Sequence, residues 1–346
     1  MFKYALLINP GHNRVYYRSS QSLSLCELTI CSQNMEALVS DIKIEAIADI
    51  PYLTFNSERE LSEKDLDVIS RLSFVFALYK VEEEMLSPVL IPNNKLTDEN
   101  LSGLLKYTGK TNELFTRMML NLALSSCDNI DYSTAVVLDP IAGKGTTLFE
   151  AAAQGINSCG IEIGEKAAAE AFTYFKKYLE TEKLKHNSDI IRQSGENKSF
   201  TAKRYKVDFA KSKEDFKNHR EVNWEMVAGN SIYADKFFKK NSIDVIVGDL
   251  PYGVQHGNIT NEKQKQTSLT RSPKDLVKAC LPAWRTVLKP GGVIALSWNT
   301  FVFPKAQFVK LMDDEGLTVL SQGAYNMLEH RVDNAIKRDI IFAKKK

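Results

Sequence analysis

Apolar positions from about residue 130 onward fall into short runs that alternate with longer amphipathic stretches. Runs of about four to eight apolar residues are typical of buried strands, whereas apolar residues three or four apart are typical of helices. This pattern predicts strands at 135–138, 158–161, 225–228, 244–247, 293–298, 317–324 and 338–343. It predicts helices between them at 146–154, 166–183, 274–288 and 305–315.

Strands that alternate with helices in this way indicate βαβ units on a parallel sheet. The last two predicted strands have no helix between them, so they should form a hairpin. We therefore predict an α/β fold of Rossmann-like type, with a seven-stranded, mostly parallel sheet that ends in a C-terminal β-hairpin.

The first 100 residues have a different pattern, in which short strands mix with one or two helices. Strands are expected at 4–8, 25–30 and 74–81, and helices at 34–40 and 63–72. The polar segment 91–100 is the expected linker, because its Pro, Asn and Asp residues favour turns. We expect a small α+β N-terminal domain over residues 1–100, a candidate RNA-binding module, and a larger domain over residues 101–346.

Residues 184–222 interrupt the larger domain with a polar stretch that is rich in Lys and Arg. Connections in α/β units usually have about 2 to 6 residues, so this stretch is an insertion. Two interpretations stay open. The stretch is either a solvated helical excursion or a contact surface for phosphates, carried by Lys198, Lys203, Arg204 and Lys206.

Composition narrows the class of protein. The chain of 346 residues is 44% hydrophobic and 25% charged, which is typical of a globular protein. No apolar run approaches the about 20 residues of a membrane span. The five cysteines are scattered and show no CxxC spacing, so neither a disulfide framework nor a zinc site is expected, and a cytoplasmic location fits best. The net charge of +2 means that any basic surface must be local.

A glycine-rich turn follows the first predicted strand of the larger domain. The strand runs into Asp139, turns at Gly143 and Gly145, and enters a helix at Thr146. Glycine permits positive φ angles and lets the backbone approach a ligand closely, and the helix N-terminus offers free N–H groups. Such a turn on its own is weak evidence, because any βα unit can contain one.

An acidic residue at the end of the next strand strengthens the assignment of a ligand site. Glu162 follows about 20 residues later, where it can accept hydrogen bonds from two ribose hydroxyls. The turn is not the GxGxxG pattern of dinucleotide sites, and Asp139 would repel a pyrophosphate. A cationic nucleoside without phosphates, S-adenosylmethionine, is therefore the expected cofactor. Asn230 could bind the adenine edge with support from Ser231, although either could equally be a turn residue.

The segment Asp249-Leu-Pro-Tyr252 ends a buried strand at the edge of the sheet where α/β proteins bind ligands. The exocyclic amine of a base is a poor nucleophile, because its lone pair is delocalised into the ring. The Asp249 carboxylate and the main-chain carbonyl of Leu250 could hold both N–H bonds and direct the lone pair at a methyl group. Pro251 would fix the backbone, and Tyr252 would offer a face for base stacking. Catalysis would come mainly from proximity, without a metal.

These motifs resemble those of class I methyltransferases, the family that includes the THUMP-associated tRNA guanine-N2 methyltransferases. The stretch from Asp139 to Thr146 is similar to that family's Asp-Pro-x-Cys/Ala-Gly-x-Gly-Thr, and the stretch that starts at Asp249 is similar to its Asp-x-Pro-Tyr/Phe-Gly. The segment 106–117 stands where the family has a cofactor-covering segment, and residues 329–333 lead into the closing hairpin. The resemblance extends over about residues 105–345.

The resemblance implies methyl transfer from S-adenosylmethionine to an exocyclic amine of a base in RNA, with guanine N2 in tRNA or rRNA as the target. It implies Asp249 as the catalytic acceptor. The expected catalytic residues are Asp249, Leu250, Pro251 and Tyr252. The expected cofactor contacts are Thr108, Asn112, Phe115, Asp139, Ala142, Gly143, Gly145, Thr146, Thr147, Glu162, Ile163, Asn230, Ser231 and Asp249. The expected RNA contacts are Lys203, Arg204, His256 and Arg331.

Three alternatives stay open at this point. A DNA adenine-N6 or cytosine-N4 methyltransferase would use the same acid-x-Pro-aromatic arrangement, although it usually needs a further domain for base flipping. A protein glutamine methyltransferase would have Asn in place of Asp249. A non-catalytic RNA-binding factor would keep the fold but not bind the cofactor.

Overall fold

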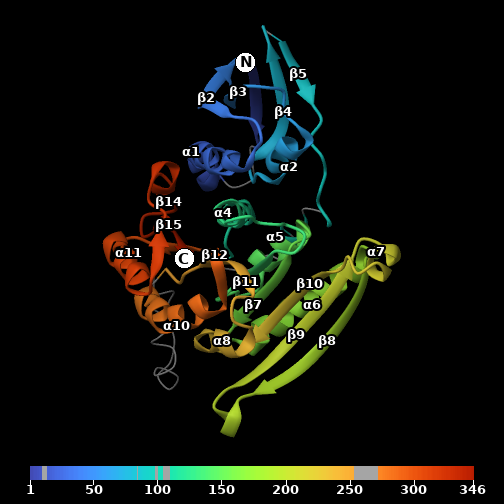
Figure 1. The fold of residues 1–346 in the computed structure, drawn as a ribbon, viewed down its shortest axis with the longest axis vertical. Coiled ribbons are helices and arrows are strands. Elements are labelled where there is room, and N and C mark those ends of the chain that lie inside the picture. Colours follow the sequence, from blue (N-terminus) through green and yellow to red (C-terminus); the bar gives the residue numbers. More distant parts are fainter. Residues whose placement is uncertain (10–13, 84, 98–99, 104–109, 253–271) are drawn as a thin grey trace.

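The computed structural model describes residues 1–9, 14–83, 85–97, 100–103, 110–252 and 272–346, with the side chains of residues 14–19 and 100 left aside. Two sheets are present in these residues, one near the N-terminus and a larger one that carries the rest of the chain (Figure 1). Helix α4 (Glu113–Ser125) lies between them, and most of its residues are buried.

The N-terminal sheet has five antiparallel strands in the order β2-β3-β1-β4-β5. Its elements are β1 (Phe2–Ile8), α1 (Arg14–Cys31), η1 (Ser32–Asn34), β2 (Val39–Ile47), β3 (Ile50–Ser57), α2 (Glu63–Arg71), β4 (Val75–Glu82) and β5 (Met85–Val89). The expected strands at 4–8 and 74–81 and the expected helix at 63–72 are confirmed by β1, β4 and α2.

Two expectations for the N-terminal module are wrong. Residues 25–30 belong to helix α1 rather than to a strand, and the expected helix at 34–40 is replaced by the turn η1 and the start of β2. A short apolar run fits a buried strand and a buried helix equally well. Packing decides in favour of the helix, because Leu23, Cys26 and Ile30 lie on one helix face and are all buried.

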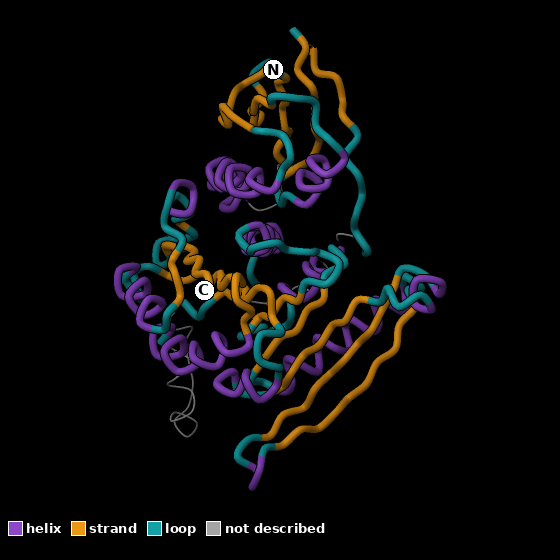
Figure 2. Tube along the Cα trace, in the orientation of Figure 1, coloured by secondary structure: helices purple, strands orange, loops and turns teal. Residues whose placement is uncertain are grey.

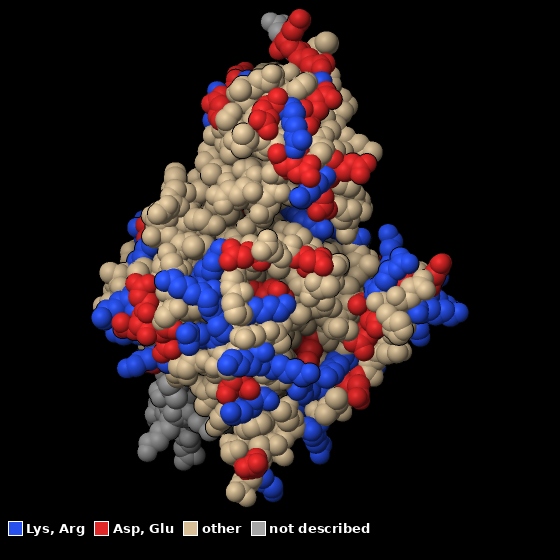
Figure 3. Space-filling model, in the orientation of Figure 1, with Lys and Arg blue, Asp and Glu red and all other residues tan. Residues whose placement is uncertain are grey.

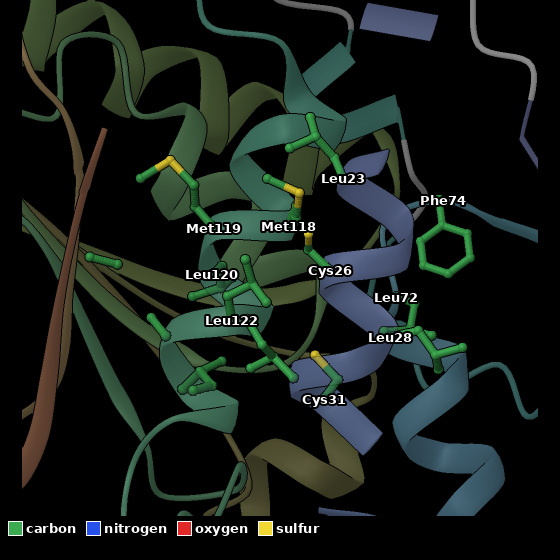
Figure 4. Close-up of a cluster of buried hydrophobic side chains, with 14 of the residues drawn as sticks. Leu23, Cys26, Leu28, Cys31, Leu72, Phe74, Met118, Met119, Leu120 and Leu122 are labelled. Carbon is green, nitrogen blue, oxygen red and sulfur yellow. The ribbon is translucent and has the colours of Figure 1, made fainter. Parts of the chain in front are cut away.

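Helix α1 packs against helix α4, so the two parts of the chain share one hydrophobic core. Figure 4 shows Cys26 and Cys31 of α1 facing Met118 and Leu122 of α4. The division of the chain into domains near residue 100 stays a prediction. The shared core means that α4, which leads to the site described below, is held from both sides.

The larger sheet has the strand order β13-β15-β12-β11-β6-β7-β10-β9-β8, with β14 paired to β15. Its strands are β6 (Val136–Asp139), β7 (Asn157–Glu162), β8 (Lys185–Ser194), β9 (Thr201–Ala210), β10 (Val222–Ala228), β11 (Ile243–Asp249), β12 (Leu288–Asn299), β13 (Leu317–Val319), β14 (His330–Arg331) and β15 (Lys337–Lys345). Strands β12, β11, β6, β7 and β10 are parallel, and the outer strands are antiparallel.

Helices cover the larger sheet (Figure 1). They are α3 (Asn100–Gly103), α4, α5 (Thr146–Ala153), α6 (Glu165–Thr181), α7 (Lys213–Lys217), α8 (Ala234–Phe237), α10 (Pro273–Val287) and α11 (Lys305–Asp314), with the short turns η2 (Glu196–Lys198), η3 (Ser231–Tyr233) and η4 (Gly323–Asn326). The structure confirms the parallel βα core and a strand in each of the seven predicted places, although the strand expected at 317–324 stops at Val319. None of the helices in the described parts of the chain is long and apolar enough to span a membrane.

The predicted count of seven strands is wrong, since the sheet has ten strands in the described residues. The insertion at 184–222 is mainly β8 and β9, a long antiparallel pair that extends from the sheet edge, so a helical excursion is also wrong (Figure 2). The cause is a period of two in β9, where Tyr205, Val207 and Phe209 are buried against α6. The charged residues between them hid this alternation.

Candidate active site

Three carboxylates lie at the same edge of the larger sheet. Asp139 ends β6, Glu162 ends β7 and Asp249 ends β11. Strand β6 pairs in parallel with β7 on one side and with β11 on the other, so the carboxyl ends of all three strands lie at the same edge of the sheet. The site therefore stands where open α/β sheets bind ligands.

The glycine turn between β6 and α5 is locked to Glu162. The backbone N–H of Gly143 donates to Oε2 of Glu162 at 3.0 Å, and the backbone N–H of Gly164 donates to Oε1 at 2.7 Å. Gly143 and Gly145 have φ angles of 54° and 88°, which side chains with a Cβ rarely adopt. Gly145 begins α5 without a side-chain cap, so the first N–H groups of the helix need another partner.

Asp139 is a buried acid, with 4% of its surface exposed. Its Oδ1 accepts a hydrogen bond from the backbone N–H of Ile141 at 3.0 Å. The pKa of Asp139 is raised to about 7, mainly by burial and to a smaller extent by the nearby charges of Asp249 and Glu162. A hydrogen bond from Thr147 acts in the opposite direction and lowers the pKa. Burial also raises the pKa of Glu162. The site thus favours a ligand that carries positive charge near Asp139.

Three hydroxyl groups donate hydrogen bonds to the carboxylate of Asp249. Thr111 donates to Oδ2 at 2.6 Å, Ser297 donates to Oδ1, and the hydroxyl of Tyr252 reaches both oxygens at 2.6 and 2.7 Å. The sequence predicted Tyr252 as a stacking surface; its hydroxyl also occupies the acceptor atoms that a substrate amine would need. Leu250 is buried, and its backbone N–H donates to the carbonyl of Ser297 at 2.9 Å.

An aromatic and cationic layer lies beside Tyr252. The guanidinium of Arg338 lies 4.3 Å from the ring centroid of Phe115 and 5.1 Å from that of Tyr252. The imidazole of His330 lies 5.4 Å from the Phe115 ring. Residue-level sequence reasoning missed Arg338 and His330, although the resemblance included the segments that hold them.

Two cavities meet at Asp249. The larger, of about 670 Å³, is lined by Glu162, Ile163, Asn230 and Ser231 among others. The smaller, of about 230 Å³, is lined by Thr111, Asp139, Ala142, Gly143, Thr146, Thr147, Leu250 and Tyr252 among others. Ile141, Asp249 and Pro251 line both cavities.

Most of the expected cofactor residues therefore line one or other of these two adjoining cavities, with three exceptions in the described residues. Phe115 is fully buried and packs on Arg338 and His330 instead. Asn112 caps helix α4 by accepting from the N–H of Phe115 at 3.0 Å. Gly145 lies against the side chains of Met226 and Phe149, which a Cβ at this position would contact at 3.4 and 3.5 Å. Thr108 and His256 lie outside the described residues.

The three expected RNA contacts that lie in the described residues all bond to other groups of the protein. Arg204 forms a two-point ion pair with Glu225 at 2.5 and 3.0 Å. Lys203 pairs with Glu165 at 3.2 Å. Arg331 donates to the carbonyl of Asp333 at 3.0 Å, within its own turn. In the described residues, no group of three or more His, Cys, Asp or Glu side chains could hold a metal ion.

The paired cavities fit S-adenosylmethionine. Each oxygen of Glu162 accepts one backbone N–H, which leaves lone pairs for the two ribose hydroxyls. The uncapped start of α5 suits a carboxylate, and the acid at Asp139 suits the cationic groups. A nucleoside in the larger cavity and an amino-acid tail in the smaller one would bring the methyl donor to their junction at Asp249.

Two solved structures are among the proteins to which this chain is similar. An rRNA methylase from Streptococcus thermophilus is 11% identical to this chain in sequence, with a TM-score of 0.33. The match covers 66% of this chain and 95% of the methylase chain. TrmN from Thermus thermophilus is 13% identical to this chain in sequence, with a TM-score of 0.39. The match covers 88% of this chain and 59% of the TrmN chain. No curated protein matches the sequence.

The family model described as UPF0020, RMKL-like, methyltransferase domain, matches residues 112–296. This match spans more than half of the chain and includes Asp139, Glu162 and Asp249. The chain therefore belongs to the UPF0020 family of RMKL-like methyltransferase domains, and it is a methyltransferase that uses S-adenosylmethionine as its cofactor.

Proposed function

We propose that the chain methylates an exocyclic amine of a base in RNA, with guanine N2 in tRNA or rRNA as the target. The observation that carries this proposal is the position of Asp249 at the junction of the two cavities, followed by Leu250, Pro251 and Tyr252. A base amine needs two acceptors for its N–H groups, and this segment offers a carboxylate and a main-chain carbonyl.

The cofactor contacts are assigned from the two cavities. Glu162 would bind the ribose hydroxyls, and Asn230 would bind the adenine edge in the larger cavity. Asp139 and the start of α5 would hold the amino-acid part in the smaller cavity. When bound, the cofactor supplies an electrophilic methyl group on a sulfonium centre.

The chain's own residues would then orient the amine. Asp249 and the carbonyl of Leu250 accept its two N–H groups, which turns the nitrogen lone pair toward the methyl group. Transfer would form the N–C bond while the cofactor's C–S bond broke, with that electron pair left on sulfur. The nitrogen becomes cationic and sheds one proton, which Asp249 can accept. Positioning of this kind accounts for most of the expected rate enhancement.

RNA as the substrate is supported by a basic hollow next to the larger cavity. The hollow, of about 440 Å³, is lined by Arg192, Lys198 and Lys203 among others, and it shares Glu165, Thr201 and Ala228 with the larger cavity. Arg192 and Lys198 are exposed and form no ion pair in the described residues. Figure 3 shows further Lys and Arg side chains over α7 at one end of the β8–β9 pair. Cations of this kind suit a phosphate backbone.

The experiment measures transfer of a labelled methyl group from S-adenosylmethionine to total tRNA, rRNA and genomic DNA, followed by nucleoside analysis. We expect label in N2-methylguanosine. Label confined to N6-methyladenine, to DNA or to protein would contradict the proposal. The same assay with Arg192→Gln/Lys198→Gln should raise the KM for RNA about tenfold at low salt, and the difference should shrink as salt rises.

Asp249→Asn tests the catalytic assignment. The amide loses the charge of the acceptor and brings an N–H group toward the substrate amine, so kcat should fall about 100-fold, which corresponds to about 3 kcal/mol. Asp189→Asn is the matched control, because Asp189 is exposed on β8 and its side chain accepts a hydrogen bond from the backbone N–H of the next residue, Ile190. Equal rates for the two variants would contradict a catalytic role for Asp249.

A further inference from the structure

Arg338 is a buried cation without a counter-ion in the described parts of the chain. It is 7% exposed, and its Nε is buried with no hydrogen-bond partner. Its guanidinium is instead held over two aromatic rings, those of Phe115 and Tyr252. An unpaired buried N–H of a charged group is unfavourable, so its persistence indicates that an external acceptor completes the site.

His330 lies opposite Arg338 in the pairing of β14 with β15. Its Nδ1 lies 2.9 Å from the carbonyl oxygen of Leu328. A carbonyl can only accept, so Nδ1 carries the ring proton and Nε2 presents a lone pair. Burial lowers the pKa of His330, and the positive charge of Arg338 lowers it further, whereas the negative charge of Asp249 raises it. The net shift is downward, so the imidazole ring is neutral at pH 7.

The layer of His330, Phe115, Arg338 and Tyr252 ends at Asp249. The Tyr252 ring contacts Arg338 on one side, and its hydroxyl bonds the Asp249 carboxylate. None of His330, Phe115 and Arg338 lines the two cofactor cavities. The layer therefore lies beside the acceptor residue but outside the space assigned to the cofactor, as a substrate-binding surface would.

We propose that His330 and Arg338 read the edge of the base whose amine Asp249 holds, and that they select guanine. This inference rests on the proposed function. Along its pairing edge, guanine presents the N2 amine, then the N1–H donor, then the O6 acceptor. Asp249 takes the amine, the Nε2 lone pair of His330 takes N1–H, and the guanidinium of Arg338 donates to O6. Adenine and cytosine present an acceptor nitrogen beside their amine, which would face the lone pair of His330.

The test compares two short RNAs that differ only in one base, guanine or 2-aminopurine. Both bases carry an amine on carbon 2, but 2-aminopurine lacks N1–H and O6. The wild-type enzyme should methylate the guanine RNA with a kcat/KM about 100-fold higher, because a site built for hydrogen bonds disfavours an analogue that leaves its polar groups unpaired.

Arg338→Met separates base reading from a structural role. Met fills a similar volume, so this variant should lose most of its rate on guanine, keep its rate on 2-aminopurine, and show a preference below about tenfold. Arg338→Lys should retain an intermediate preference, because it keeps the charge and loses the planar fork. Calorimetric titration with S-adenosylmethionine should give unchanged affinity for both variants, which checks that they fold.

The outcomes distinguish the two proposals. Equal methylation of both RNAs by the wild type overturns the reading of the base edge and leaves RNA amine methylation standing. An equal loss on both RNAs in Arg338→Met also overturns it, because a structural role would produce that result. Failure of the wild type on both RNAs and on total tRNA and rRNA overturns the proposed function, and this inference with it.

Discussion

Lowering the pH from 8 to 6 should weaken the binding of S-adenosylmethionine about tenfold, because Asp139 takes up a proton in this range. Burial, together with the smaller effect of the neighbouring charges of Asp249 and Glu162, raises the pKa of Asp139 to about 7. A protonated acid has no charge to offer a cationic ligand. The cofactor therefore binds the ionised form more tightly, and its own positive charge favours that form.

The magnitude follows from the fraction of Asp139 that is ionised. With a pKa of about 7, roughly nine tenths is ionised at pH 8 and roughly one tenth at pH 6. The apparent dissociation constant rises by the inverse of the competent fraction, which gives about tenfold, or about 1.4 kcal/mol. Because the pKa of Asp139 is raised in the folded state, the cofactor-free protein binds more protons than the unfolded chain between about pH 4 and 7. The contribution of Asp139 to the free energy of unfolding therefore falls as the pH rises from about 4 to 7.

Calorimetric titration of the cofactor at pH 6, 7 and 8 measures this effect. Asp139→Asn is the matched control, since the amide oxygen can still accept from the N–H of Ile141. The variant should bind more weakly at pH 8 and show a flat profile. A wild-type profile that is flat, or a variant that keeps the wild-type slope, would refute the assignment of Asp139. Glu162→Gln tests whether the second raised acid adds to the slope.

Two further predictions concern packing and access to the acceptor. Gly160→Ala should lower the free energy of unfolding by about 1 to 3 kcal/mol, because the new Cβ would lie 2.8 Å from the Cβ of Ala142 in a closed core. Thermal melting measures this loss, and Gly103→Ala, which meets nothing within 4 Å, should melt like the wild type. Tyr252→Phe keeps the ring but removes the hydroxyl that occupies Asp249, so the KM for RNA should fall several-fold in steady-state assays. An unchanged or higher KM would contradict competition between the hydroxyl and the amine.

The parallel core and its three acidic strand ends could be predicted from the sequence because they depend on local pattern. Buried strands of a parallel sheet are continuous apolar runs, and the turn after each one is a short, readable segment. Asp139, Glu162 and Asp249 each follow such a run directly. Once the strands are parallel, their carboxyl ends meet at one edge, so the site was fixed by order along the chain.

The remaining features depended on tertiary contacts that no local pattern specifies. Residues 25–30 became helical because α4 buries that face, and β9 added to the sheet because α6 covers its alternate residues. His330 and Arg338 reached Asp249 only through the pairing of β14 with β15 and the ring of Phe115. The sequence determines which segments must be buried, because any apolar partner of the right shape satisfies burial. Only the tertiary packing determines which segment covers which, because a particular side-chain contact requires one particular partner.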